Sequence, residues 1–306
     1  MKANSIQKKF IICLLLTLSV QFSSAVNPEG PVALWDGYNV RSGEDVQLYA
    51  FVPEHPSGIS VIVCPGGSYH WLDEEGEGLE VGDWLCRQGI TAFVLFYRTA
   101  GAAEFAWHTR ILFRGRRYPD MIVDAQRALH YVREDADRYG INRERIGMMG
   151  FSAGGHLVMS TACFHHTDFL EQIYGQPAGT DLKPAFVAAI YPVVTMNRPY
   201  VHRRSRRGLL GDSKTHNRTM RDSLSIEKHI PEDCPPVFLI NCADDPVVPY
   251  QNSVLLDSAL TAKHIPHKYI QYAEGKHGFG VSDYFGSDES REWKNEFLTW
   301  LSLTIH

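Results

Sequence analysis

The chain has 306 residues, of which 44% are hydrophobic and 21% are charged, and its formal net charge is −5. This length and composition suit one large globular domain with an ample core. A mildly acidic chain has no electrostatic reason to bind nucleic acid, so that class of function is excluded.

The first residues have the features of a secretory signal peptide. Three lysines precede an almost entirely apolar stretch at 10–20, and small residues lead to a plausible cleavage point after Ala25. The apolar stretch is too short to predict a membrane span, and no other segment is long and apolar enough to cross a bilayer. We therefore expect a signal peptide at 1–25, a single domain at 26–306, and export to the periplasm or the medium.

Strand-like apolar runs alternate with helix-like periodicities along the rest of the chain. This alternation predicts an α/β protein with a mostly parallel sheet that helices cover on both faces. Pro119 is typical of the first position of a helix, and apolar residues keep helical spacing from there to Tyr139. We expect strands at 46–52, 59–64, 90–97, 145–150, 186–193, 237–242 and 268–272, and helices at 78–88, 119–139, 153–164, 250–260 and 289–303.

One turn between a predicted strand and a predicted helix carries a motif with chemical meaning. Gly150-x-Ser152-x-Gly154 follows a short apolar run and leads into a helix at Ala153. A serine on such a tight turn has a strained backbone that only small neighbours tolerate, and its hydroxyl stands clear of the sheet. The helix N-terminus beneath it favours negative charge. The motif alone is weak evidence, but its position is that of a nucleophile.

An acid and a base follow the serine in the order of a known hydrolase class. Asp244 and Asp245 end one predicted strand, and His277, flanked by glycine, follows the next strand along the chain. Sites in parallel α/β sheets form at the carboxyl ends of the strands, so we expect these side chains to lie near Ser152. The order serine, aspartate, histidine is that of α/β-hydrolases and differs from that of chymotrypsin and subtilisin.

A Gly-Gly loop follows the predicted strand at 59–64. Backbone N–H groups in such a loop can point toward a developing oxyanion. We expect the N–H of Gly67 to form an oxyanion hole with that of Ala153, the residue after the nucleophile, and the N–H of Gly66 is a further candidate. An ordinary turn is the alternative interpretation of these glycines taken alone.

Together the motifs resemble those of the α/β-hydrolase esterases of bacterial polysaccharide degradation, the acetylxylan and feruloyl esterase type. The resemblance covers nearly the whole chain after the signal peptide. The family loop usually has a third glycine where this chain has Ser68. The motifs that carry the resemblance are Pro65–Tyr69, Phe96–Arg98, Gly150–Leu157, Asp244–Pro249 and Gly275–Gly280.

The resemblance implies an α/β-hydrolase fold with an eight-stranded type of sheet and a serine esterase that needs no cofactor and no metal. Ser152 would be the nucleophile and His277 the base. In this family two residues and then Val-Pro follow the acid, which selects Asp245 over Asp244. The implied substrate is an acetylated plant polysaccharide of the xylan type, or its oligosaccharides, with feruloyl as the alternative acyl group.

Several residues near these motifs are candidates for substrate contacts. His70 and Trp71 follow the oxyanion loop, and they either line the substrate pocket or pack in the core. Glu74, Glu75 and Glu77 are most simply a solvated approach to the next helix, where their charge is favourable. A solvated face is also the default for five arginines, but Arg203 and Arg204 could form a rim that attracts uronic-acid groups. The five are Arg198, Arg203, Arg204, Arg206 and Arg207.

Other histidines are interpreted as structural. His156 lies four residues after the serine, on a helix that runs away from it. The sequence His165-His166-x-Asp168 suggests a metal site, but adjacent residues on a helix point about 100° apart, so the two imidazoles are not expected to share an ion. We expect a solvated helix end there instead.

Two other functions stay open at the level of sequence. A prolyl-type serine peptidase has the same triad order, but such enzymes usually carry a further domain that restricts the substrate. A glycan-binding, catalytically silent hydrolase fold would have no need to keep all three side chains. Activity on a small chromogenic acetate beside an aminoacyl amide separates these functions. The sequence predicts no oligomeric state.

Overall fold

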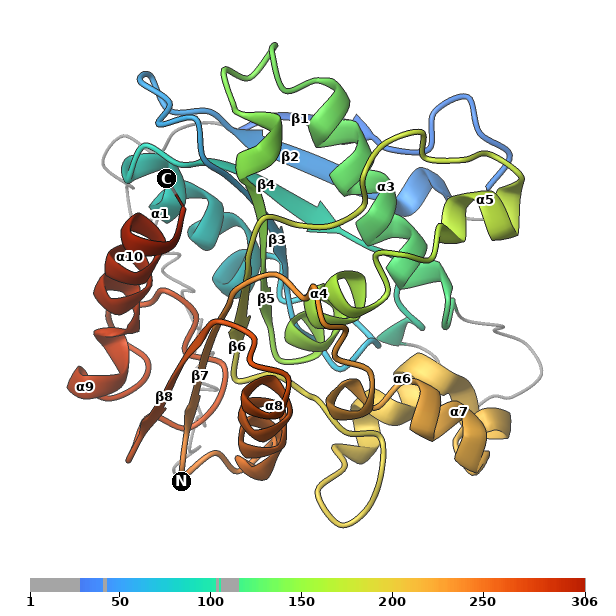
Figure 1. Cartoon of the computed structure of the whole chain (residues 1–306), viewed down its shortest axis with the longest axis vertical. Coiled ribbons are helices and arrows are strands. Elements are labelled where there is room, and N and C mark those ends of the chain that lie inside the picture. The colour runs from blue at the N-terminus through green and yellow to red at the C-terminus, as the bar shows by residue number, and fades with distance from the viewer. Residues whose placement is uncertain (1–27, 41–42, 103–104, 106–115, 306) are drawn as a thin grey trace, which may run out of the picture.

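A computed structural model describes residues 28–40, 43–102, 105 and 116–305, and an eight-stranded sheet lies at its centre (Figure 1). The predicted signal peptide at 1–25 lies outside the described residues. The strand order is β1-β2-β4-β3-β5-β6-β7-β8. β2 is antiparallel to both of its neighbours, and all other neighbours are parallel. The strands are β1 Glu29–Ala33, β2 Gln47–Phe51, β3 Ser60–Cys64, β4 Thr91–Phe96, β5 Ile146–Phe151, β6 Val187–Ile190, β7 Val237–Cys242 and β8 His267–Tyr272.

Helices cover both faces of this sheet, as the alternating pattern predicts (Figure 1). α1 (Glu80–Arg87) and α10 (Trp293–Thr304) pack on one face, and α3 (Asp120–Glu134), α4 (Ala153–Cys163) and α8 (Gln251–Ala262) pack on the other. Within the described residues, no helix is both long and apolar enough to span a membrane. The shorter helices are α5 Phe169–Tyr174, α6 Arg203–Lys214, α7 Arg218–Ser223, α9 Asp288–Arg291, the π-helical turn η2 Glu75–Leu79, and the 3-10 turns η1 Gly43–Asp45, η3 Arg143–Arg145 and η4 Ile226–Lys228.

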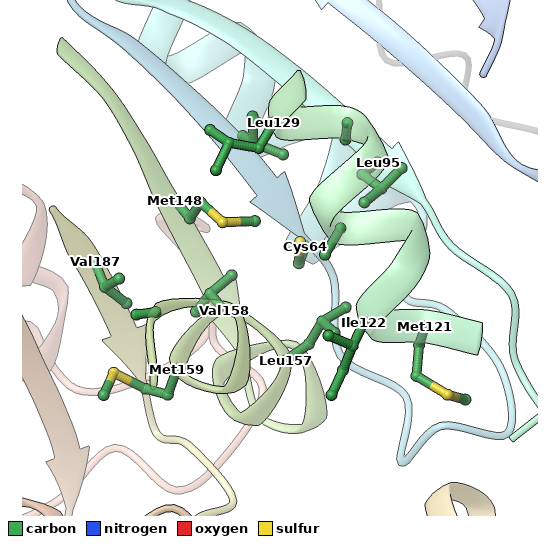
Figure 2. Close-up of a cluster of buried hydrophobic side chains, with 14 of the residues drawn as sticks. Cys64, Leu95, Met121, Ile122, Leu129, Met148, Leu157, Val158, Met159 and Val187 are labelled. Atoms are coloured by element: carbon green, nitrogen blue, oxygen red, sulfur yellow. The ribbon is translucent and has the colours of Figure 1, made fainter. Parts of the chain in front are cut away.

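The larger apolar core lies between the sheet and helices α3 and α4. Leu95 of β4 and Met148 of β5 share this cluster with Leu129 of α3 and Val158 of α4, and all four side chains are fully buried (Figure 2). Strands β3 to β7 are buried on both faces of the sheet. Strands that are buried on both faces need apolar side chains at every position, so their sequences are continuous apolar runs.

The helix expected from Pro119 to Tyr139 is shorter than its apolar spacing suggests. Pro119 flanks the helix rather than beginning it, and the helix ends at Glu134. The chain then turns, and Gly140 has a left-handed backbone with φ of 63°. The Tyr139 ring still packs on that of Phe93, with the centroids 4.9 Å apart. The apolar spacing therefore continues beyond the helix because the core contacts continue.

Four elements lack a clear sequence signal: β1, α5, α6 and α7. α6 carries most of the arginine cluster and is interrupted at Gly211, where φ is 74°. The helix expected at 78–88 begins with the π-helical turn η2, and the helix expected at 289–303 is divided into α9 and α10. The remaining predicted strands and helices agree with the structure to within three residues at either end.

A buried ion pair connects the end of β4 to α3. Arg98 Nη2 lies 2.7 Å from Asp124 Oδ1, and the two side chains are 1% and 0% exposed. The same carboxylate accepts from the backbone N–H of Arg98 and from Nε1 of Trp35, each at 2.9 Å. The arginine of the Phe96-Tyr97-Arg98 motif therefore has a structural role that secures α3 against the sheet.

Candidate active site

Ser152 lies at the turn between β5 and α4, where the motif predicts it. Its backbone is strained, with φ of 52° and ψ of −112°. The Ser152 N–H donates to the carbonyl of Ile190 at 2.9 Å, and its carbonyl accepts from the N–H of Val193 at 3.0 Å. A Cβ added to Gly154 would lie 2.0 Å from the carbonyl oxygen of Cys64, so only glycine fits there.

His277 connects Ser152 to Asp245. Its Nδ1 lies 2.6 Å from Oδ2 of Asp245, and its Nε2 lies 2.9 Å from Oγ of Ser152. An ionised carboxylate only accepts hydrogen bonds, so Nδ1 carries the proton and Nε2 accepts from the serine hydroxyl. The side chains of His277 and Asp245 are 12% and 1% exposed, so solvent screens their interaction little. This arrangement can remove a proton from the serine.

The two neighbouring aspartates have different partners. Asp245 Oδ1 accepts from the N–H groups of Val247 and Val248 at 2.7 and 2.9 Å, which leaves Oδ2 directed at His277. Asp244 Oδ1 accepts from the backbone N–H of Lys276 at 2.8 Å. Asp244 therefore holds the loop that carries the histidine, and Asp245 contacts the imidazole itself.

One N–H group of the expected oxyanion loop, that of Gly66, is not available to an oxyanion. The N–H of Gly66 donates to Oε2 of Glu77 at 2.8 Å, so the expectation that Gly66 contributes to an oxyanion hole is wrong. In the part of the chain that the structure describes, the N–H groups of Gly67 and Ala153 have no acceptor. These two donors therefore remain available to an oxyanion.

Ser68 and Tyr69 hold the oxyanion loop in an unusual conformation. Both have a left-handed backbone, with φ of 59° and 62°, which glycine adopts at lower cost. The Tyr69 hydroxyl donates to Nδ1 of His156 at 2.8 Å, and Nε2 of His156 donates to the carbonyl of Leu224 at 2.8 Å. Burial lowers the pKa of His156 to about 4, so the ring stays neutral. The prediction of a structural role for His156 is confirmed.

Glu77 is buried behind the oxyanion loop, and the interpretation of it as a solvated residue is wrong. Its exposed fraction is 3%. Oε1 accepts from the hydroxyl of Tyr191 at 2.8 Å, and that hydroxyl accepts from the N–H of Gly280 at 3.1 Å. Burial raises the pKa of Glu77 to about 6, against the attraction of His277 and its two hydrogen-bond donors. The two flanking glycines, Gly76 and Gly78, are the only local hint of this close packing.

The candidate substrate-contacting residues separate into buried and exposed groups. His70 has no exposed surface, which favours core packing, and burial together with Arg207 lowers its pKa to about 4. Trp71 is half-buried, and the guanidinium of Arg204 lies over its ring at 5.7 Å from the centroid. Arg203 and Arg204 are exposed. Arg206 is buried and donates to a backbone carbonyl, so it does not belong to a rim.

His202, which precedes α6, lies close to the candidate site and has no distinctive sequence signal. Burial lowers its pKa to about 4, with further contributions from the charges of His277 and Arg204, while Asp245 opposes the shift. Its Nδ1 lies 2.8 Å from Oγ of Ser205. Burial thus keeps this imidazole neutral, and the charges of the Asp245–His277 pair act on it.

His165 and His166, just beyond the C-terminal end of α4, both approach the carboxylate of Asp233. The argument that adjacent helical residues point too far apart to share a partner is therefore wrong here. The two histidines follow the end of the helix, in a turn, where the helical angle does not apply. Nε2 of His165 and Nε2 of His166 lie 3.0 and 3.1 Å from the two oxygens of Asp233. Nζ of Lys183 lies 3.5 Å from the same carboxylate, so this carboxylate also has a cationic partner in the chain. Asp168 instead caps α5.

The fold agrees with comparisons to known proteins. The BD-FAE family model matches residues 60–260, which is more than half of the chain. The chain belongs to the BD-FAE family. The α/β-hydrolase fold expected from the motifs is confirmed, as is the resemblance to carbohydrate esterases.

Two curated relatives and one solved structure illustrate this likeness. The acetylxylan esterase of Xylanibacter ruminicola is 28% identical over 249 residues, which cover 81% of this chain and 46% of that protein. Endo-1,4-beta-xylanase B of Butyrivibrio fibrisolvens is 32% identical over 244 residues, covering 77% of this chain and 36% of that protein. The chain thus spans less than half the length of these relatives. The acetyl ester-xyloside bifunctional hydrolase of Caldicellulosiruptor lactoaceticus has a TM-score of 0.76 and 27% identity, with 92% of this chain and 98% of that one covered.

Proposed function

We propose that this protein is a serine carboxylic-ester hydrolase that works through an acyl-enzyme. The observation that carries the proposal is the continuous set of contacts from Ser152 Oγ through His277 to Asp245, at 2.9 and 2.6 Å. A relative named as an acetylxylan esterase and a similar solved structure named as an acetyl ester-xyloside bifunctional hydrolase support it. The chemistry requires no metal and no organic cofactor.

In the first half of the reaction His277 Nε2 takes the proton of Ser152 as Oγ attacks the ester carbonyl carbon. Asp245 orients the imidazole and stabilises its charged form. The N–H groups of Gly67 and Ala153 donate to the oxyanion of the tetrahedral intermediate. When the intermediate collapses, the C–O bond to the alcohol breaks, and His277 returns the proton to the leaving oxygen. In the second half water replaces the alcohol and releases the acid.

The proposed substrate is an acetyl ester on a plant polysaccharide of the xylan type, or on its oligosaccharides. The family and the relatives named for acetylxylan and xylan support this class of substrate. We place Trp71, Arg203 and Arg204 at the rim that contacts the sugar, because Trp71 follows the oxyanion loop, the exposed Arg204 lies over its ring, and Arg203 is the exposed neighbour of Arg204 in α6. Export by the segment at 1–25 would bring the enzyme to such polymers.

The experiment that tests the function compares chromogenic acetate, butyrate and an aminoacyl amide, followed by acetate release from acetylated xylan. We expect rapid cleavage of the acetate, slow cleavage of the longer ester, no cleavage of the amide, and release of acetate from the polymer. Ser152→Ala is the control for each reaction. Release of ferulate from feruloylated arabinose without release of acetate would replace the proposed acyl group, and cleavage of the amide alone would replace the proposed class.

A further inference from the structure

We propose that Glu77 is a positioning residue that couples the oxyanion loop, residues 65–69, to the histidine loop, residues 275–280. This inference rests on the proposed function, because it concerns how the two halves of that site are held in register. It adds to the site a side chain whose hydrogen-bond partners are Gly66 and Tyr191 rather than the serine or histidine of the triad.

The two carboxylate oxygens of Glu77 bind one donor from each side. Oε2 accepts from the N–H of Gly66, next to the proposed oxyanion donor Gly67, at 2.8 Å. Oε1 accepts from the hydroxyl of Tyr191, also at 2.8 Å, and that hydroxyl accepts from the N–H of Gly280 at 3.1 Å. A single buried side chain therefore connects two loops that are more than 200 residues apart in sequence.

Tyr191 also contacts the base directly. Its ring centroid lies 4.7 Å from that of His277 and 4.8 Å from that of Phe279. Tyr191 itself has a strained backbone, with φ of 36°. The ring packs against the imidazole at an interplanar angle of 54° while the hydroxyl accepts from Gly280, so a shift of Tyr191 would displace the base as well as the loop. Errors of about 1 Å at such distances cost a large part of catalysis.

The network requires a carboxylate rather than an amide. All of the neighbours of Glu77 in the network are donors, and an amide has only one acceptor oxygen, so the substitution Glu77→Gln would leave Gly66 or Tyr191 without its acceptor. A buried unsatisfied group of this kind is costly. The charged groups that face Glu77 are His277, which attracts it, and Asp73, which repels it. The negative charge of Glu77 therefore favours the protonated imidazole that forms during the reaction.

The test compares Glu77→Gln with the matched control Glu75→Gln, an exposed glutamate of the same turn. We expect Glu77→Gln to lower kcat on a chromogenic acetate by about 10- to 100-fold with little change in KM, since a misplaced oxyanion donor acts on the transition state. Tyr191→Phe should have a similar effect, and the double variant should lose little more than either single variant, because both disrupt one network. Glu75→Gln should behave like the wild type.

The pH profile separates positioning from general structural damage. Removing a negative charge that faces His277 makes protonation of the imidazole less favourable, so the acid limb of kcat/KM should move to lower pH in Glu77→Gln. Damage to the fold alone would lower the rate without moving the limb. Wild-type rates in Glu77→Gln, or a reduced rate with an unmoved acid limb, would overturn the inference. If wild type and Ser152→Ala were equally inactive on every ester, the proposed function itself would fail.

Discussion

Asp245 Oδ2 lies 2.6 Å from His277 Nδ1, whereas the adjacent Asp244 binds the backbone N–H of Lys276. Two neighbouring carboxylates thus serve one histidine in different ways. One is in position to set the tautomer and stabilise the charge of the ring, and the other holds the loop on which the ring stands.

Because the two carboxylates have different partners, we expect the substitutions Asp245→Asn and Asp244→Asn to lower kcat by different amounts. Asp245→Asn should lower kcat by about 10⁴-fold, because the amide can donate to Nδ1 and so favours the wrong tautomer. Asp244→Asn keeps an acceptor for the Lys276 N–H, so we expect a loss of less than about tenfold. Steady-state rates of both variants on a chromogenic acetate provide the measurement. A larger loss in Asp244→Asn would contradict the assignment.

The buried ion pair between Arg98 and Asp124 should contribute strongly to stability. Asp124→Asn leaves the buried guanidinium of Arg98 with only the Asp120 carboxylate, 3.8 Å from Nη1, as a counter-charge, so we expect the free energy of unfolding to fall by about 3 kcal/mol. The matched control is Asp83→Asn, which disrupts the Arg87–Asp83 pair at the surface, with side chains 48% and 21% exposed. That change should cost less than about 1 kcal/mol. Denaturant unfolding of both variants measures the difference, and equal losses would refute the proposed role.

The raised pKa of Glu77 predicts that the free energy of unfolding increases as the pH falls. Its pKa in the folded chain is about 6, above its usual 4.5, so the folded state binds this proton more tightly than the unfolded state does. The group therefore stabilises the fold as pH falls through 6, an effect that is complete below 4.5 and worth about 2 kcal/mol.

A glutamine cannot take up this proton. Between about pH 7.5 and pH 5, the wild type should gain on the order of 1 kcal/mol of unfolding free energy relative to Glu77→Gln. Chemical denaturation of the two proteins at both pH values measures this difference. A difference that does not change with pH would show that Glu77 is not the buried acid described.

The exposed arginines of α6 should distinguish acidic from neutral substrates. The guanidinium of Arg204 lies over the rings of Trp71 and Phe105, at 5.7 and 5.2 Å from their centroids, which fixes its charge beside the site. Arg204→Glu should raise KM several-fold for acetylated oligosaccharides that carry a uronic acid and leave KM for neutral ones unchanged. Salt should reduce the wild-type preference. Arg203→Glu, without such stacking in the described part of the chain, should have a smaller effect. Equal losses on both substrates would mean that the segment is structural.

The sequence was most informative where burial leaves a continuous apolar signal. Strands β3 to β7 are covered on both faces, so their apolar runs and the residues at their carboxyl ends could be placed. Ser152 and Asp245 follow two of these strands, β5 and β7, whereas His277 follows the partly buried edge strand β8, and the structure brings the three side chains together. α6 gave no comparable signal, because its arginines and serines do not show the apolar periodicity of a buried helix.

The misjudged side chains depend on contacts that no local pattern reports. The acceptor for the Gly66 N–H is Glu77, eleven residues away, in a stretch of acids that otherwise suggests solvent. The convergence of His165 and His166 depends on Asp233, which lies more than 60 residues further along the chain, and on where α4 ends. Long-range partners of polar side chains are set by the assembled fold, and neither composition nor periodicity contains them.

The acyl-enzyme itself is the most direct test of the proposed mechanism. Wild-type protein should be mixed briefly with a chromogenic acetate, quenched in acid and digested, and the peptide that contains Ser152 examined by mass spectrometry. We expect an acetyl group on Ser152 that is absent from Ser152→Ala, whose turnover should fall by about 10⁴-fold or more. An acetyl group on another residue, or a Ser152→Ala variant that keeps a tenth of the wild-type turnover, would contradict the mechanism.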